Sequence, residues 1–241
     1  MFNIKQTLYT LLVVCSLGCD NAFAALNGES HTVAVKYVIR SLGSDIGTVS
    51  AKTVGTATDN DFRADADVNV GFLFYGFSLK SSETASIRGG KLVKYHKTIN
   101  TKGHSREITG ELDGNNFNIT VRDGEKLIHK KFPATAYVTT NMEYTEISLA
   151  PGEIRRRRVI DLENAEIVDR EYRHVAEEQA VINGQSSTMI ATNFADNNSE
   201  AKRWTTIIGG LPIVIRQEGK EKTGLFNPSY SVRQISITAD P

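Results

Sequence analysis

The sequence predicts an all-β protein with little helix, in which a single antiparallel curved sheet forms a barrel or an unclosed half-barrel. Apolar and polar residues alternate over short stretches, and turn-forming pairs recur between those stretches. Near the start, Val33, Val35, Tyr37 and Ile39 occupy every second position, which is typical of a strand with one buried face. Hydrophobic residues make up 40% of the 241 residues, enough to bury the core of one large β-domain.

Glycine-containing pairs predict the turns between strands. Asp-Gly and Asn-Gly supply the positive φ angles that two-residue hairpin loops require. The predicted turns lie at Asp113-Gly114, Asp123-Gly124, Asn183-Gly184, Gly89-Gly90 and Gly209-Gly210. Segment 117–121 stands between two Asp-Gly pairs and is predicted to be a short strand. The whole pattern indicates roughly a dozen antiparallel strands.

Two regions have some helical character in their composition. Segment 133–142 is the best helix candidate, but its threonines and valine are poor helix formers. Segment 159–180 is rich in glutamate, yet its apolar residues do not follow a 3.6-residue period, so strands are predicted there. Because no Pro-rich or Ser-rich linker divides the chain, residues 25–241 are predicted to be a single domain.

Residues 1–24 have the pattern of a secretory signal peptide. Lys5 precedes an apolar run at 8–18, and Ala22-Phe23-Ala24 is a small-x-small cleavage site, so the mature chain is predicted to begin at Ala25. A membrane-spanning helix needs about 20 apolar residues, so no transmembrane helix is expected in the mature protein. The predicted location is periplasmic, or secreted from a bacterial cell.

Both cysteines, Cys15 and Cys19, lie inside this segment, so cleavage at Ala24 leaves no thiol. A second interpretation makes Cys19 the lipid-anchored N-terminus, because residues 16–19 loosely resemble a bacterial lipobox. Gly18 fits that motif, whereas Ser16 stands where an apolar residue is expected. We therefore favour the soluble form.

Composition and motifs argue against several classes of function. Lys plus Arg and Asp plus Glu are equal at 28 each, whereas a protein that binds nucleic acid through its phosphates shows a basic excess. No nucleic-acid partner is therefore expected. The five histidines lack the short spacings of a zinc site, so no metal site and no cofactor are predicted.

No catalytic residue is assigned, because the sequence contains no GxSxG elbow and pairs no serine with a base. The carboxylates of region 163–171, Glu163, Glu166, Asp169 and Glu171, leave an enzymatic alternative open. Four arginines at 155–158 lie just upstream, and cross-strand ion pairing accounts for both runs together. The protein is therefore more readily understood as a non-enzyme.

The most informative segment is apolar. Residues 68–79 carry several aromatic side chains and no charge, which indicates a central core strand or a strand that lines a cavity. Gly71 and Gly76 bracket the aromatic residues and are read as a bend or bulge. The predicted ligand-binding residues are Phe72, Phe74, Phe77, Trp204 and Ile213.

Residues 202–220, around Trp204, read KRWTTIIGGLPIVIRQEGK. This tryptophan strand, with its Gly-Leu-Pro turn and alternating return strand, resembles a hairpin of the periplasmic lipoprotein-localisation-factor superfamily. Segments 37–54 (YVIRSLGSDIGTVSAKTV) and 83–103 (ETASIRGGKLVKYHKTINTKG) resemble an uncharacterised family of exported bacterial β-rich proteins.

The resemblance implies an unclosed barrel around an apolar cavity, often plugged by a helix, for which segment 133–142 is the available candidate. It also implies that the cavity accepts acyl chains or that the sheet presents a face to a partner protein. The function expected is non-catalytic periplasmic binding of a hydrophobic ligand, such as a lipid or acyl chain, or of an envelope partner protein. The alternatives are an envelope hydrolase or isomerase using region 163–171, and an accessory subunit of a secretion or surface-assembly complex.

Overall fold

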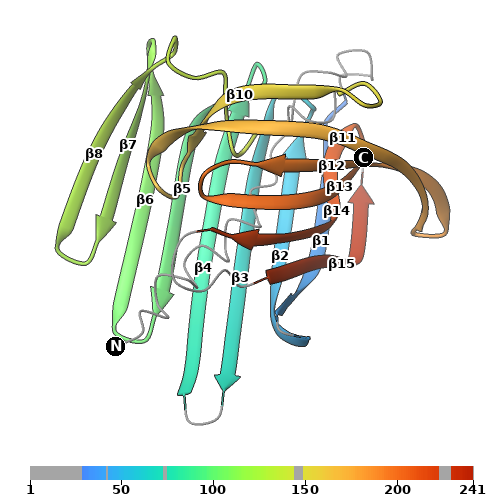
Figure 1. The fold of residues 1–241 in the computed structure, drawn as a ribbon, viewed down its shortest axis with the longest axis horizontal. Coiled ribbons are helices and arrows are strands. Elements are labelled where there is room, and N and C mark those ends of the chain that lie inside the picture. Colours follow the sequence, from blue (N-terminus) through green and yellow to red (C-terminus); the bar gives the residue numbers. More distant parts are fainter. Residues whose placement is uncertain (1–28, 42, 73–74, 144–148, 223–228, 241) are drawn as a thin grey trace.

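The computed structural model describes residues 29–41, 43–72, 75–143, 149–222 and 229–240. The predicted signal peptide, Cys15, Cys19 and Phe74 lie outside these residues. The described part of the chain contains strands and turns without a helix, which confirms the all-β fold class (Figure 1). No helix long and apolar enough to cross a membrane occurs among the described residues.

The strands form two halves of one sheet. The N-terminal half comprises β1 (His31–Ser41), β2 (Ser44–Gly55), β3 (Asn60–Phe72), β4 (Tyr75–Arg88), β5 (Lys91–Thr101), β6 (His104–Asp113), β7 (Asn116–Asp123) and β8 (Lys126–Pro133). The C-terminal half comprises β9 (Thr139–Thr140), β10 (Ile154–Asp161), β11 (Glu166–Ile182), β12 (Gln185–Ala195), β13 (Ser199–Ile208), β14 (Leu211–Glu221) and β15 (Ser229–Asp240).

The sheet is an open meander of 15 strands in the order β8-β7-β6-β5-β4-β3-β2-β1-β15-β14-β13-β12-β11-β10-β9. Strands that are consecutive in the sequence are paired, except β8 with β9, and the first and last strands join the two halves. All pairs are antiparallel except β9 with β10. The sheet edges β8 and β9 do not pair, so the barrel is unclosed.

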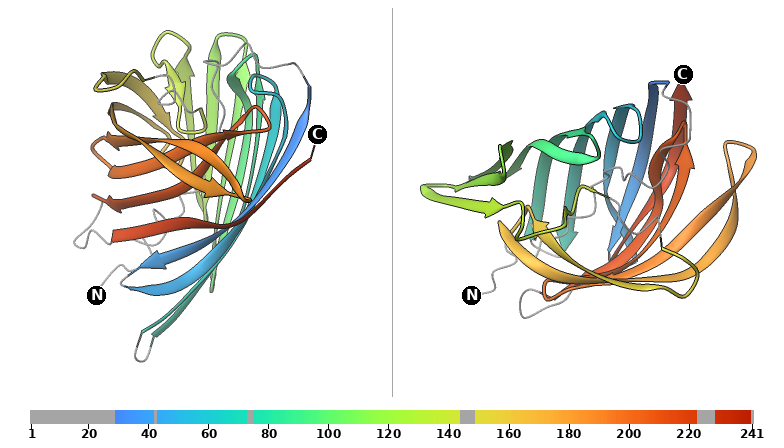
Figure 2. Two further views of the ribbon diagram at one scale, coloured as in Figure 1. Left: turned by 90° about the vertical axis from the view of Figure 1, so that its right-hand side faces the viewer. Right: turned by 90° about the horizontal axis from the view of Figure 1, so that it is seen from above.

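The two halves cross each other. In Figure 1 the strands β10–β13 run across those of the N-terminal half, and Figure 2 shows the halves as two walls of a curled sheet. The inward positions of β1 are Val33, Val35, Tyr37 and Ile39, all buried as the alternation predicted. They belong to a main core that also receives Leu162 and other residues of the C-terminal half, so one core spans both halves.

The predicted turns are confirmed. Gly114 and Gly184 adopt positive φ angles of 54° and 79°, and Asn183 also has a positive φ, as two-residue hairpin turns require. Segment 159–180 lies in β10 and β11, as predicted. Segment 133–142 contains β9 and turns but no helix, because Thr139 and Thr140 pair with the end of β10. It is therefore not a helical plug.

Segment 68–79 differs from the single core strand that its apolarity indicated. It forms the end of β3 and the start of β4, and Gly71 pairs directly with Gly76 across this hairpin. The last pairs with the flanking strands are Gly47 with Val68 and Leu79 with Thr101. The hairpin end therefore extends beyond its neighbours. This hairpin could not be predicted from the sequence, because no Asn-Gly or Asp-Gly pair lies between the two strands.

Candidate functional site

The structure places the five predicted ligand-binding residues in different surroundings. Phe77, on β4, is half-buried against the main core, and Ile213, on β14, lies within that core. Phe72 ends β3, where its side chain is not described, and Phe74 lies outside the described residues. Trp204, on β13, lines a small hollow to which neither Phe77 nor Ile213 contributes.

We call this site the Trp204 hollow. It has a volume of about 290 Å³, near the lower end of the range for ligand sites. Its walls combine apolar side chains with a charged rim. The lining residues are Glu178, Ala180, Val181, Ile182, Met189, Trp204, Ile215, Arg216, Arg233 and Gln234. They come from β11, β12, β13, β14 and β15, so the hollow requires five neighbouring strands of the C-terminal half.

β-Bulges shape the hollow. Trp204 pairs with Arg216 and Thr205 pairs with Val214, so Ile215 is an extra residue with no partner on β13. On β15, Ile235 is similarly left over in the pairing with β1, next to Gln234 of the lining. A bulge bends its strand and re-aims a side chain, which explains why an otherwise regular sheet is hollowed here.

Trp204 is held through its ring. The Lys202 ammonium and the Arg216 guanidinium lie 4.4 and 4.5 Å from the ring centroid, within the range of cation–π attraction. The side chain is 5% exposed, and its Nε1 has no hydrogen-bond partner among the described residues. An unsatisfied buried donor costs about 1–3 kcal/mol, so the ring contacts must offset that cost.

The mouth of the hollow is apolar as well as charged. Val181, a lining residue at the end of β11, is 75% exposed, and Ile235 beside Gln234 is 56% exposed. Exposed β-branched residues next to an apolar hollow extend its apolar surface outward. A hydrophobic molecule in the hollow would therefore also contact its mouth.

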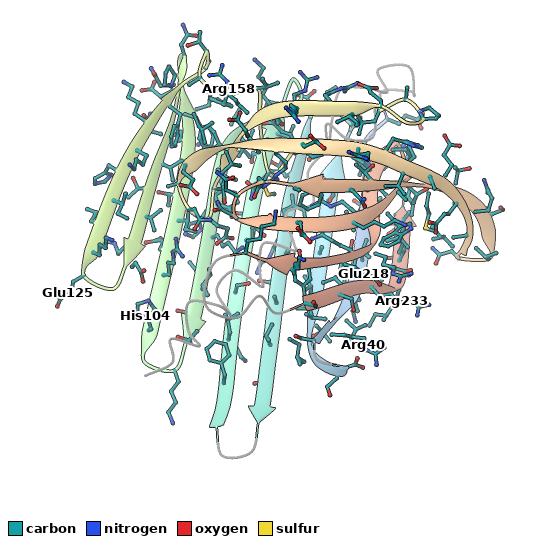
Figure 3. All side chains as sticks on the ribbon, in the orientation of Figure 1. Arg40, His104, Glu125, Arg158, Glu218 and Arg233 are labelled. Atoms are coloured by element: carbon teal, nitrogen blue, oxygen red, sulfur yellow. The ribbon has the colours of Figure 1, made fainter. Side chains whose placement is uncertain are left out.

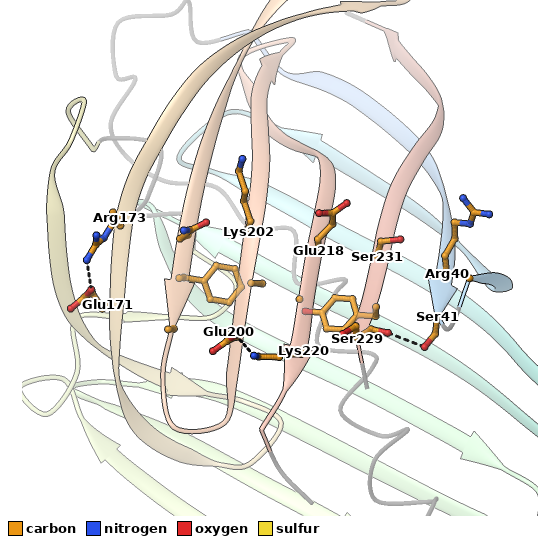
Figure 4. A pocket seen from close by; sticks show the side chains of 17 residues that line it. Arg40, Ser41, Glu171, Arg173, Glu200, Lys202, Glu218, Lys220, Ser229 and Ser231 are labelled. Carbon is orange, nitrogen blue, oxygen red and sulfur yellow. Dashed lines mark hydrogen bonds and ion pairs between the residues drawn. The ribbon is translucent and has the colours of Figure 1, made fainter. Parts of the chain in front are cut away.

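A larger and more polar depression, the outer groove, crosses β11–β15 and the end of β1. It has a volume of about 870 Å³, and Figure 4 shows charged side chains from several strands along it. Its charges neutralise one another: Glu200 accepts Lys220 at 2.7 Å, Arg173 lies 3.5 Å from Glu171, and Arg40 pairs with Asp45 at 2.7 Å. This groove therefore offers no concentrated charge to a ligand.

A third feature, the Lys97 cluster, is buried between the two halves and consists of Glu83, Tyr95, Lys97 and Glu163. Lys97 projects from the inner face of β5 and is 1% exposed. It donates to Glu163 Oε1 of the β10–β11 turn and lies 3.9 Å from Glu83 Oε1 on β4. The Tyr95 hydroxyl donates to the same Glu83 oxygen at 2.6 Å. These contacts fasten the turn to the inner face of the N-terminal half.

Burial dominates the electrostatics of the Lys97 cluster. It raises the pKa of Glu83; Lys97 opposes the shift and Glu163 adds to it. Burial and the two carboxylates also raise the pKa of Tyr95 well above its ordinary value. Glu83 Oε2 has no hydrogen-bond partner among the described residues. Lys97 is thus one cation next to two buried carboxyl groups. When Glu83 is protonated, the charges of Lys97 and Glu163 cancel and the cluster is neutral.

The carboxylates of the acidic region 163–171 contact different partners. Glu163 belongs to the Lys97 cluster, Glu166 accepts the Asn198 amide at 2.7 Å, and Glu171 pairs with Arg156 at 3.0 Å. The last contact is the cross-strand ion pairing that the two charged runs indicated. The described carboxylates of this region are therefore spread over the β10–β11 turn and β11.

Two histidines lie beside carboxylates. His96 lies 3.0 Å from Glu107, and His104 contacts Asp123. His96 faces Thr109 in the β5–β6 register, whereas Thr101 pairs with His104, so the two histidines do not meet across this hairpin. Within the described residues, no group of three or more His, Cys, Asp or Glu is arranged to hold a metal ion.

Sequence reasoning missed the Lys97 cluster and the rim of the Trp204 hollow. A signal for the first was present: Lys97 occupies the inward phase of β5 between Tyr95 and Ile99. Its partner Glu163 is 66 residues away, and sequence periodicity does not show which distant residues meet. The rim depends on bulges, which alternation does not predict.

Comparison with known proteins agrees with this fold. The family model described as Domain of unknown function (DUF6134) matches residues 37–209. The structure is similar to the crystal structure of a β-barrel-like protein of Domain of Unknown Function DUF1849 from Brucella abortus, with a TM-score of 0.63 and 7% sequence identity over 89% of this chain and 99% of that chain. At this identity the likeness concerns the fold alone. No curated protein matches the chain.

Proposed function

The chain belongs to the family described as Domain of unknown function (DUF6134), and from this premise we propose that it is a non-catalytic binding protein that holds a hydrophobic ligand in the Trp204 hollow. The observation that carries the proposal is the lining of that hollow. Ala180, Met189, Ile215 and the Trp204 ring form an apolar surface inside a charged rim. Apolar walls with a few polar groups are typical of small-molecule sites.

The resemblance to the lipoprotein-localisation-factor superfamily supports the same proposal, because proteins of that superfamily accept acyl chains in a half-barrel. The proposal includes export to the periplasm, which rests on the predicted cleavage before Ala25. An N-terminal sequence starting at Ala25 in the purified protein supports export. A lipid-modified Cys19 would replace the soluble form by an anchored one, and an intact Met1 in the cytoplasm would exclude export.

Trp204 makes the site directly measurable, because it is the only tryptophan in the chain. We expect the neutral apolar probe N-phenyl-1-naphthylamine to bind and to accept excitation energy from Trp204. Met189→Lys should abolish this transfer by placing a charge inside the hollow. Ala180→Leu, which fills the hollow without a charge, should weaken it and guards against a folding defect in the first variant.

Leu127→Lys is the matched control, because Leu127 is an exposed apolar residue on β8 in the other half of the sheet. It should leave energy transfer unchanged. Absence of transfer in the unaltered protein, or equal transfer in all variants, would overturn the proposed site. Native mass spectrometry of the purified protein adds a second readout: a co-purified lipid supports the proposal, whereas a stoichiometric protein partner supports the interaction alternative.

A further inference from the structure

The rim of the Trp204 hollow carries two arginines in direct opposition. Arg216 on β14 and Arg233 on β15 are partners in the strand register, and both line the hollow. Both side chains are exposed, and Figure 3 shows Arg233 labelled on this part of the C-terminal half. Like charges directly opposite each other on neighbouring strands repel. The arrangement is therefore unfavourable unless each arginine has a negative charge near it.

The other charges of the rim are matched within the protein. Arg216 donates from Nε to Glu218 Oε1 at 2.9 Å, and Lys202 lies 3.7 Å from Glu178. Arg233, in contrast, has no ion pair and no hydrogen bond from its side chain to any described residue. One positive charge at the mouth of the hollow is thus left without a counter-charge from the described part of the chain.

Resting on the proposed function, we infer that the ligand is an anionic amphiphile, whose carboxylate or phosphate headgroup binds Arg233 beside Arg216 while its chain occupies the Trp204 hollow. The guanidinium group suits both headgroups because its planar N–H donors match two oxygens at once. The apolar part then contacts Met189, Ile215 and the exposed Val181 at the mouth. One molecule thereby satisfies both the free charge and the apolar lining.

A series of ligands that each contain ten carbon atoms tests the headgroup. Decanoate, decyl phosphate, decanol and decylammonium are titrated into the purified protein below their micelle concentrations, with Trp204 fluorescence as the readout. We expect the two anions to bind at least about tenfold more tightly than decanol, and decylammonium to bind most weakly. The stronger of the two anions then identifies the headgroup class. Raised ionic strength should reduce the advantage of the anions.

Arg233→Gln should remove the preference for anions, so that decanoate and decyl phosphate bind no more tightly than decanol does. Arg122→Gln on β7 is the matched control, since Arg122 is an exposed arginine of the other half. It should leave the whole series unchanged.

Equal affinity for decanoate, decyl phosphate and decanol, or an anion preference that survives Arg233→Gln, would overturn the headgroup inference alone. Failure of all four ten-carbon ligands to bind would instead overturn the proposed function.

Discussion

The Lys97 cluster and the Trp204 hollow differ in whether the protein itself supplies partners for their charged groups. In the cluster, Lys97 and Glu163 are almost fully buried and pair with each other across the two halves. At the hollow, Trp204 Nε1 lacks a partner and Arg233 lacks a counter-charge among the described residues. Within the described part of the chain, the cation of the cluster is paired, although Glu83 Oε2 lacks a partner, whereas at the hollow a cation stays unpaired beside an apolar opening.

This difference separates structural from binding roles. A buried ion pair that closes on itself fixes how two segments meet and offers little to a ligand. A bulged sheet region with free polar groups gains interactions only when something binds. The contrast indicates that the Lys97 cluster helps to assemble the fold, and it supports our proposal that the Trp204 hollow binds a ligand.

The largest expected effect comes from removing the cation of the cluster. Lys97→Met should destabilise the protein by about 3–5 kcal/mol, because Glu163 is left buried without its partner. The free energy of unfolding in urea, followed by far-ultraviolet circular dichroism, measures this loss. The double variant Lys97→Met, Glu163→Gln should recover much of it, because the charge of Glu163 is removed together with that of Lys97. A single variant as stable as the unaltered protein would contradict this role of the cluster.

The pH dependence of stability tests the same cluster through Glu83. Burial raises its pKa above the ordinary value of 4.5, so the folded protein retains this proton to higher pH than the unfolded chain does. The stabilisation from protonated Glu83 is complete below the ordinary pKa and is lost as the pH rises through the folded-state pKa. The unfolding free energy relative to Glu83→Gln should therefore fall as the pH rises above about 4.5.

The exposed Glu125, labelled in Figure 3 at the β7–β8 turn, supplies the control for this titration. Unfolding free energies of Glu125→Gln and the unaltered protein should run parallel across the same pH range. A Glu83→Gln variant whose stability also stays parallel to that of the unaltered protein would exclude a raised Glu83 pKa.

The smallest expected effects come from two substitutions, each of which removes one hydrogen-bond donor from one of the two regions. Trp204→Phe removes a donor that has no described partner, so we expect a loss of about 1 kcal/mol or less, mainly from the smaller ring. Tyr95→Phe removes the hydroxyl that donates to Glu83 at 2.6 Å, and the loss should be about 1–3 kcal/mol. Thermal and urea unfolding of the two variants side by side measure the contrast. The reverse order would mean that the roles of the two regions are exchanged.

Local patterns in the sequence were sufficient for the architecture but not for the site. Alternation along 31–39 and the Asp-Gly and Asn-Gly pairs depend on neighbouring residues, so they predicted strands, turns and one curved sheet. Whether that sheet closes into a barrel was left open, and the structure shows that it does not. The interpretation of segment 68–79 as one core strand was wrong. A buried strand and an apolar hairpin without an Asn-Gly or Asp-Gly pair have the same uninterrupted run of apolar residues. Trp204 was predicted to bind ligand, whereas the structure places Ile215 and not Ile213 beside it.

By itself, then, the sequence determined the fold class and most of the hairpins, because strand period and turn chemistry are set within a few residues. It also determined the composition of the site, a single tryptophan within a strand that carries cations. Only the tertiary structure decided that Lys97 meets Glu163 and that Arg216 faces Arg233, because both contacts depend on strand register and on how the halves cross. The bulge at Ile215 likewise belongs to the assembled sheet, since an extra residue exists only relative to a partner strand.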